Sequence, residues 1–254
     1  MHTEYKQRLK QEFDRDGYVV IRGFFQGPEL AELQANVERF IRERVPKMPP
    51  EHVFYEDKQR PDSLKQLQVM HTYDPFFEKL FLGSRLERLA ETLLDDRVVG
   101  KNLQYFNKAP GVGQPTPPHQ DGYYFWLDPC EALTMWLALD EVDEENGCVR
   151  YVRGSNHLGM RHHAASGVLG FSQGMTDFGT EADCENEVAL PAKPGDLLVH
   201  HALTIHRADG NQSAGRTRRS LGFIYYAARA KENREDKDAY QQRLKDELLA
   251  AGKI

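Results

Sequence analysis

The second half of the chain carries a series of short runs of β-branched and apolar residues, and these runs restrict its fold most. Turn-rich pieces, not helices, separate them. The runs begin at Val98 and read VVGKNLQYFNK, ALTMWLALDEV, CVRYV, EVALPA, DLLVHHALTIH and RRSLGFIYYA. Strands that follow one another without intervening helices favour antiparallel pairing, so this region predicts an antiparallel sandwich or barrel. The long connection 154–186 is compatible with a Greek-key crossing of a jelly roll.

Alternation within two of these runs predicts which face of the sheet packs against helices. One face carries bulky apolar side chains, namely Leu133, Met135, Leu137, Leu139, Leu221, Phe223 and Tyr225. The opposite face is mixed and partly polar, with Thr134, Trp136, Ala138, Arg218, Ser220, Gly222 and Ile224. Because successive side chains of a strand point to opposite faces, we expect the first set to be covered and the second to line a cavity.

The first part of the chain reads mainly as helix. Apolar residues recur at helical spacing over 3–15 and 27–45, and 74–96 predicts two helices broken near Gly83 and Ser84. A short β-branched run at 18–24 predicts one strand between the first two helices.

These patterns predict a mainly β fold with flanking helices, organised as a single domain over residues 1–254. We expect a helical part at about 1–97 to pack on one sheet, a jelly-roll core at about 98–228, and a C-terminal helix at about 231–252. Segments 46–61 and 154–186 are candidate lids, since specificity often lies in loops on a rigid scaffold.

Composition excludes several classes of function. The net charge of −6 and the pI of about 5.9 argue against a nucleic-acid partner, which needs a clustered basic surface. No apolar run reaches the length of a membrane span, and the charged N-terminus lacks a secretory signal. The three cysteines Cys130, Cys148 and Cys184 form no CxxC pair, so reduced thiols and a cytoplasmic location are expected.

His119 and Asp121, in PTPPHQDGYY, are candidate metal ligands together with the distant His206. An i, i+2 pair on an extended segment directs both side chains to one face of a sheet. A histidine from a later strand then completes three ligands on one side of a metal ion. Two imidazoles and one carboxylate are the ligand set of non-haem Fe(II) oxygenases, which leaves positions open for a cosubstrate and O₂.

Blander interpretations of these histidines remain open. An HxD motif alone is common and is often a histidine hydrogen-bonded to an aspartate in a turn. His206 is favoured as the third ligand because it ends the apolar run, immediately before the turn-like RADGNQS. His200 and His201 lie near the same strand and are alternatives, as core residues or as residues behind the ligands.

Three arginines follow His206, and one of them is a candidate anchor for 2-oxoglutarate. The far carboxylate of that cosubstrate needs a cation, and a guanidinium binds a carboxylate through two parallel hydrogen bonds. Strand alternation favours Arg218, on the inward face with Ser220, whose hydroxyl is a further candidate contact. Arg219 then points to the opposite face and Arg216 stays in the turn, although a basic turn facing solvent is the commoner origin of such a cluster.

At these residues the chain resembles the phytanoyl-CoA dioxygenase family of Fe(II)/2-oxoglutarate-dependent oxygenases. The matching segments are FDRDGYVVIRGFF, NKAPGVGQPTPPHQDGYYF, MWLALDEVDEENGCVRYVRGSNHLG and KPGDLLVHHALTIHRADGNQSAGRTRRSLGFIYY, in that order. The resemblance implies a double-stranded β-helix (jelly-roll) core, His119, Asp121 and His206 as ligands of Fe(II), and Arg218 as the anchor of the cosubstrate.

The resemblance also implies further cosubstrate contacts. Trp136 resembles a residue that walls the 2-oxoglutarate pocket, Gln104 lies on the strand before the HxD motif, and Lys65 matches a basic position that reaches cosubstrate or substrate. The implied activity is a dioxygenase that hydroxylates a small organic substrate and releases succinate and CO₂. Halogenating relatives lack the metal carboxylate, so the intact Asp121 favours hydroxylation.

Two departures from the family pattern keep other interpretations open. Ala208 stands where a small hydroxyl residue is frequent, and the interval from His206 to Arg218 is one residue longer than expected, which keeps Arg216 and Arg219 as alternative anchors. The alternatives in function are a catalytically inactive jelly roll that binds a metal or small molecule, and an enzyme of other chemistry on a similar barrel.

Overall fold

The computed structural model describes residues 3–111, 113–168 and 171–250. The longer helices are α1 (Thr3–Asp16), α2 (Gly27–Glu43), α3 (Pro75–Phe81), α4 (Arg85–Leu94) and α7 (Arg234–Ala250). The short ones are α5 (Gly122–Phe125) and α6 (Glu181–Asn186), with single 3₁₀ turns at η1 (Val45–Lys47), η2 (Pro50–His52), η3 (Pro61–Ser63), η4 (Met70–Thr72) and η5 (Ser155–Leu158). No helix in the described ranges is both long and apolar enough to cross a membrane.

Two antiparallel sheets form the core. The seven-stranded sheet has the order β1 (Tyr18–Ile21), β12 (Leu197–His201), β7 (Ala132–Ala138), β14 (Arg218–Ala227), β4 (Val98–Lys108), β3 (Leu64–Leu67), β2 (Val53–Tyr55). The four-stranded sheet has the order β11 (Glu187–Leu190), β8 (Val149–Val152), β13 (His206–Ala208), β5 (Thr116–His119). Two small ribbons pair β9 (His163–Val168) with β10 (Phe171–Met175), and β6 (Leu127–Asp128) with β15 (Lys231–Glu232). The expected jelly-roll core is confirmed.

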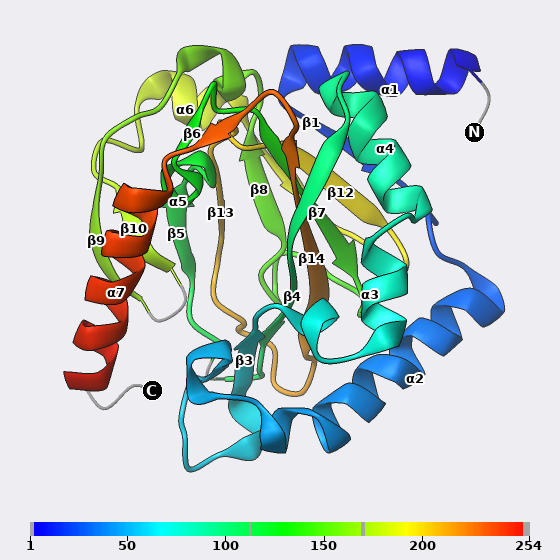
Figure 1. The fold of residues 1–254 in the computed structure, drawn as a ribbon, viewed down its shortest axis with the longest axis vertical. Coiled ribbons are helices and arrows are strands. Elements are labelled where there is room, and N and C mark those ends of the chain that lie inside the picture. Colours follow the sequence, from blue (N-terminus) through cyan, green and yellow to red (C-terminus); the bar gives the residue numbers. More distant parts are fainter. Residues whose placement is uncertain (1–2, 112, 169–170, 251–254) are drawn as a thin grey trace.

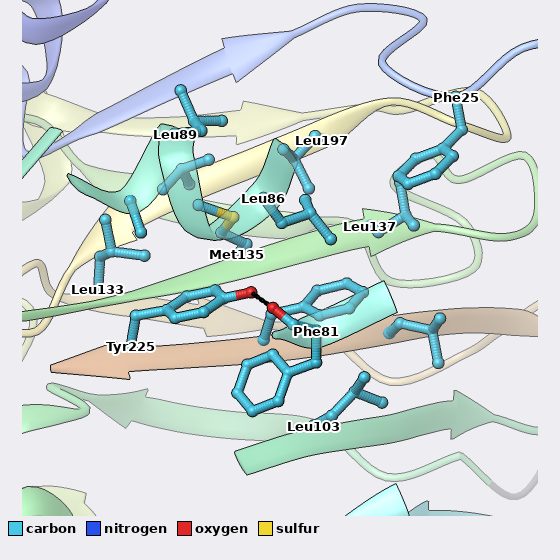
Figure 2. Packing of buried hydrophobic residues seen from close by; sticks show 14 of the residues in the cluster. Phe25, Phe81, Leu86, Leu89, Leu103, Leu133, Met135, Leu137, Leu197 and Tyr225 are labelled. Atoms are coloured by element: carbon cyan, nitrogen blue, oxygen red, sulfur yellow. Dashed lines mark hydrogen bonds between the residues drawn. The ribbon is translucent and has the colours of Figure 1, made fainter. Parts of the chain in front are cut away.

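The helical first part covers one face of the seven-stranded sheet, as predicted. Helices α1 to α4 lie along one side of the fold, and α7 lies on the opposite side (Figure 1). The apolar face predicted from alternation packs under these helices: Met135, Leu137 and Leu221 are fully buried in one cluster with Phe81 and Leu86. Figure 2 shows this packing. The opposite face of β7 and β14 is thereby left to line the space between the sheets.

A buried tyrosine hydroxyl forms a hydrogen bond within this apolar layer. The Tyr225 hydroxyl donates a hydrogen bond of 2.7 Å to the backbone carbonyl of Phe81, at the last residue of α3 (Figure 2). The hydroxyl therefore finds a partner inside the core and satisfies a carbonyl that the end of the helix leaves unpaired.

Two predictions about connections are wrong. The segment 154–186 does not cross between sheets: it joins β8 to β11, which pair with each other, and it carries η5, β9, β10 and α6 as an excursion between them. The run DLLVHHALTIH is not one strand. It divides into β12 in the large sheet and β13 in the small one, because the chain turns at 202–205, where the Thr204 amide donates to the His201 carbonyl at 2.9 Å.

An ion pair joins α2 to the start of α3 and makes stability depend on pH. Both carboxylate oxygens of Asp74 accept hydrogen bonds of 2.8 Å from Arg39, and Arg44 adds one of 3.1 Å. Asp74 is buried, and chiefly the hydrogen bonds from Arg39 lower its pKa from 3.8 to about 2. A carboxyl whose pKa is lower in the folded state stabilises the fold above its unfolded pKa, and that contribution is lost as the pH falls toward 2.

We therefore expect Asp74→Asn to lower the free energy of unfolding by about 2 kcal/mol at pH 7. Asparagine keeps an oxygen that accepts the N-cap hydrogen bond from the Phe76 amide, whereas its NH2 group replaces the oxygen that accepts from Arg39 and Arg44. Urea unfolding of both proteins at a series of pH values checks this: the gap should narrow between pH 4 and pH 2. A gap that is constant over this range would contradict the assignment.

Candidate metal centre and cosubstrate pocket

Three predicted ligand residues converge between the two sheets. His119 and His206 are directly opposite each other on the neighbouring strands β5 and β13, with ring centroids 4.1 Å apart. Asp121 Oδ1 lies 3.5 Å from His119 Nε2 and 3.7 Å from His206 Nε2. One ligand atom from each residue lies within 4.8 Å of the other two. Among the described residues, no other group of three or more histidine, cysteine or acidic side chains has this spacing. The arrangement suits one metal ion bound on one side.

Asp121 reaches this point by a turn and not by strand alternation. Strand β5 ends at His119, and Asp121 has helical dihedral angles (φ −57°, ψ −33°) at the start of α5. The side-chain amide of Gln120 holds the turn. Its Nε2 donates to the backbone carbonyls of Gly159 and Leu203 at 2.9 and 2.8 Å, and its Oε1 accepts from the backbone N–H of Arg161 at 2.8 Å. Sequence reasoning missed Gln120, whose only signal was its place between two ligands.

Backbone carbonyls orient both imidazoles. His119 Nδ1 donates to the Pro117 carbonyl at 2.8 Å, and His206 Nδ1 donates to the Thr204 carbonyl at 2.9 Å. Since a carbonyl accepts only, each Nδ1 is the donor in these hydrogen bonds, and each Nε2 is directed toward Asp121 Oδ1 at the centre of the group. Such hydrogen bonds fix the tautomer of a metal-binding histidine.

The carboxylate of Asp121 is oriented in the same way. Its Oδ2 accepts hydrogen bonds from Thr134 Oγ1 at 2.5 Å and from His200 Nε2 at 3.0 Å, which leaves Oδ1 directed between the two histidines. His200 Nδ1 accepts in turn from the Tyr151 hydroxyl at 2.8 Å. His200, one of the alternative ligands, therefore lies behind the carboxylate and not beside the metal position.

The protonation states fit a cation. Burial, with the neighbouring His119 and His200, lowers the pKa of His206 well below its usual value, so the imidazole is neutral at pH 7. Burial alone would raise the pKa of Asp121, but interactions with His206, His119 and His200 outweigh it, and the pKa lies well below the usual range. A neutral imidazole, as in His206, and an ionised carboxylate are the forms that bind a metal ion.

Removing the group behind the carboxylate should weaken metal binding without removing a ligand. We expect His200→Phe to lower the affinity for Fe(II) by about 10- to 100-fold, because outer partners orient metal ligands. Tyr151→Phe is the matched control, since it keeps the bond from His200 to Asp121 and should have a smaller effect. Anaerobic titration of metal into the apoprotein measures both. Equal affinities in His200→Phe and the parent protein would sink the assignment.

Arg218 lies in the same cavity and is a buried cation without a carboxylate partner among the described residues. Its Nε donates to the Gly147 carbonyl at 3.0 Å, and its guanidinium lies 4.8 Å from the centroid of the Trp136 ring. The side chain is 5% exposed, and burial lowers its pKa to about 10, so it remains charged at pH 7. A buried charge of this kind is costly unless an anion compensates it.

Gly147 makes this geometry possible. Its φ is +85°, a region that favours glycine, and a Cβ at this position would lie 2.4 Å from the Asp209 carbonyl oxygen. The glycine of the ENGC motif therefore turns its carbonyl toward Arg218, and any side chain there would have to displace the backbone.

The two alternative arginines are already paired. Arg219 lies on the outward face and donates to Asp140 at 2.8 Å and to Glu38. Arg216 pairs with Asp143 at 2.9 Å and with Glu145. Both therefore lie where the alternation predicted them.

Of the other four residues predicted to contact the cosubstrate, the structure places two in the cavity. Trp136 and Gln104 line the cavity with Arg218, whereas Lys65 and Ser220 are not among its lining residues. Lys65 is buried in an ion pair of 2.9 Å with Glu56, on the face of β3 opposite Gln66. Ser220 is fully buried between β7 and β4, and its Oγ has no hydrogen-bond partner among the described residues.

The cavity has a volume of about 780 Å³ and extends from the metal position to a mouth formed by three segments. Both candidate lids border it, through Glu51, His52 and Phe54 and through Ala165, Gly167 and Val168. Helix α7, which the sequence predicts as a C-terminal helix, is the third border; its position beside the cavity is not part of that prediction. It lines the cavity with Lys237, Tyr240, Gln241, Leu244 and Lys245, whose spacing of three and four residues places them on one helical face. Of the aromatic run after the HxD motif, Tyr124 and Phe125 line the cavity.

Solved structures share this fold. The epimerase SnoN in complex with Fe³⁺, alpha ketoglutarate and nogalamycin RO superposes with a TM-score of 0.74 at 25% identity, over 91% of this chain and 87% of that one. EctD from S. alaskensis, solved with 2-oxoglutarate and 5-hydroxyectoine, gives a TM-score of 0.69 at 23% identity, over 87% and 75% of the two chains. SnoK, a carbocyclase from nogalamycin biosynthesis, gives 0.72 at 22%, over 91% and 86%.

The proteins that match in sequence include several named for phytanoyl-CoA dioxygenase. The phytanoyl-CoA dioxygenase domain-containing protein 1 homolog of Caenorhabditis elegans is 26% identical in an alignment that covers 81% of this chain and 85% of the relative. Phytanoyl-CoA dioxygenase 1 of Oryza sativa is 30% identical over 148 residues, 57% of this chain and 51% of the relative. The family described as phytanoyl-CoA dioxygenase (PhyH) matches residues 13–220. This chain, with its two-sheet core and its His–Asp–His group, belongs to the phytanoyl-CoA dioxygenase family.

Proposed function

We propose that the protein is a non-haem Fe(II)- and 2-oxoglutarate-dependent dioxygenase that hydroxylates a small organic substrate. The observation that carries this is the pairing, in one cavity, of a three-residue ligand group with a buried arginine that lacks a carboxylate partner among the described residues. The first suits a divalent metal ion, and the second suits a dianionic cosubstrate. The complex of the relative SnoN with Fe³⁺ and alpha ketoglutarate supports the same pair of ligands.

In this proposal His119, Asp121 and His206 hold the iron, and Arg218 binds the far carboxylate of 2-oxoglutarate. Bound iron supplies the activation of O₂ that no protein side chain provides. The overall reaction consumes the substrate, 2-oxoglutarate and O₂. One oxygen atom enters the substrate as a hydroxyl, the other enters the new carboxylate of succinate, and the first carbon of the cosubstrate leaves as CO₂.

The chain's own residues position these groups and exclude water. Trp136 lies against the Arg218 guanidinium and walls the cosubstrate side. On the other side, Phe125 and Ile224 are buried and line the cavity beside Tyr226, where they give the substrate an apolar surface next to the ligand group. The hydroxyl missing at Ala208 removes one hydrogen bond to the cosubstrate and leaves Arg218 as its main anchor.

Hydroxylation is the outcome that we propose among those known for this fold. Structural neighbours include an epimerase and a carbocyclase, so the fold accommodates other oxidative outcomes. Formation of succinate from 2-oxoglutarate in the presence of Fe(II), ascorbate and air, without added substrate, tests the oxygenase assignment. A protein that binds metal but forms no succinate would instead be a binding module. A product that gains one oxygen atom from O₂ then distinguishes hydroxylation from epimerisation or ring closure.

A further inference from the structure

We propose that the substrate is an organic anion and that Lys101 and Lys237 bind its carboxylate or phosphate at the mouth of the cavity. This inference rests on the proposed oxygenase function, because it describes what enters the same cavity. It concerns the charge of the substrate, which the spacing of Lys101 and Lys237 in the sequence does not indicate.

Two lysines from distant parts of the chain meet at one aromatic ring. Lys101 lies in β4 and Lys237 in the first turns of α7, and both line the cavity. Their Nζ atoms lie 4.9 and 5.5 Å from the centroid of the Tyr226 ring, which also lines the cavity. Their side chains are 27% and 19% exposed, so water screens them only in part.

One carboxylate serves both ammonium groups. Glu232 accepts from Lys101 through Oε2 at 3.0 Å and from Lys237 through Oε1. Arg234 approaches the same carboxylate at 3.8 Å from the exposed side. No second acidic group pairs with Lys101 or Lys237 among the described residues. The corner of the cavity formed by Lys101, Lys237 and Glu232 therefore has two positive charges against one negative charge.

The remaining charges around the cavity are compensated. Lys245 of α7 pairs with Glu51 at 3.1 Å across the mouth, and Arg207 pairs with Glu187 at 2.6 and 2.8 Å. At the centre, the charges of Fe(II) and Arg218 balance those of Asp121 and 2-oxoglutarate in the proposed complex. The excess charge at Lys101 and Lys237 therefore has no counterpart within the loaded cavity, and an anionic substrate supplies it.

The surfaces next to the lysines suit the organic part of such a molecule. Tyr226 packs on Phe125 with ring centroids 5.0 Å apart, and Tyr240 and Leu244 of α7 face the same space. A lysine ammonium binds carboxylates and phosphates as a compact charge with three donors, and an aromatic edge beside it accepts an apolar body. The ion pairs of Glu232 with Lys101 and Lys237 also hold α7 against β4. If the two lysines had only this structural role, they would bind no anion.

Matched pairs of ligands separate these two roles. The probes are aryl and alkyl carboxylates, each with the carboxamide of the same carbon frame, and the phosphate monoesters of the corresponding alcohols. Dissociation constants are measured by calorimetry under nitrogen, on protein loaded with Fe(II) and saturating 2-oxoglutarate. We expect the best acid to bind at least about tenfold more tightly than its amide, because hydrogen bonds to charged groups exceed neutral ones by that margin. The carboxylate and phosphate series then show which anion the corner prefers.

Three single variants and one double variant localise the effect. Lys101→Gln and Lys237→Gln should abolish the preference for the acid, whereas Lys245→Gln, a lysine of the same mouth with its own partner, should keep it. The proposal is overturned if no anionic probe binds the parent protein better than its neutral amide. It is also overturned if the preference for the acid survives in the Lys101→Gln/Lys237→Gln double variant, or if it is lost in Lys245→Gln. If a variant unfolds under the assay conditions, a parent protein that prefers no acid over its amide still overturns the proposal. Failure of 2-oxoglutarate to bind would instead refute the proposed function.

Discussion

Asp121→Ala is expected to lower succinate formation by at least about a hundredfold and to abolish tight binding of Fe(II). Removing a group that only orients a metal ligand already costs about 10- to 100-fold in affinity or activity, and this substitution removes a ligand itself. It also removes the negative charge that compensates a divalent ion between two neutral imidazoles. Metal titration of the apoprotein, followed by the succinate assay, measures both effects.

Asp121→Asn sharpens this test. The amide keeps the shape of the side chain and an oxygen that can accept from Thr134 or His200, but it carries no charge. We expect it to lose Fe(II) as well, because a neutral amide oxygen is a much weaker ligand than a carboxylate. His162→Ala, an exposed histidine outside the ligand group, is the control and should behave as the parent protein does. Normal iron binding in Asp121→Asn would show that the aspartate has a structural role only.

Arg218→Gln is expected to raise the KM for 2-oxoglutarate about a hundredfold. Two hydrogen bonds between a guanidinium and a carboxylate contribute about 3 kcal/mol together, and 1.4 kcal/mol corresponds to a factor of ten. The buried guanidinium has no carboxylate partner among the described residues, so the anion it would bind is the cosubstrate. The change should fall mainly on KM, since the far carboxylate takes no part in bond breaking.

The neighbouring arginines provide the matched control for this experiment. Arg219→Gln breaks the pair with Asp140 on the outward face of β14, and Arg216→Gln breaks the pair with Asp143 in the turn. Both should leave the KM within about twofold of the parent value, because neither arginine nor its partner lines the cavity. If Arg219→Gln raises the KM as much as Arg218→Gln, the anchor has been assigned to the wrong arginine.

Much of the fold could be predicted because it follows from local periodicity. The alternation in β7 and β14 separates Met135 and Leu221, which pack on helices, from Trp136 and Arg218, which face the cavity. A strand in a half-covered sheet has only two faces, so a few apolar residues determine the direction of every side chain in it. The same alternation distinguishes Arg218 from Arg219.

The structure differs from the sequence-based expectation where the chain leaves regular structure. The pattern predicts His206 at the end of one long strand, yet His206 begins β13 in the other sheet. Strand alternation predicts the direction of Asp121, but a turn held by Gln120 directs it. Both residues still reach the ligand group, because contacts with segments far along the chain decide where each turn goes, and no local pattern records those contacts.

By itself, the sequence determined the strand-rich core, its two faces, and the residue types that can bind a metal ion and a dicarboxylate, since these depend on spacing along a single segment. Only the tertiary structure decided that His200 lies behind Asp121, that Lys65 is held by Glu56, and that α7 borders the mouth of the cavity. The physical reason is that hydrogen bonds and ion pairs between distant segments form only after the sheets have packed, and they depend on where backbones meet in space.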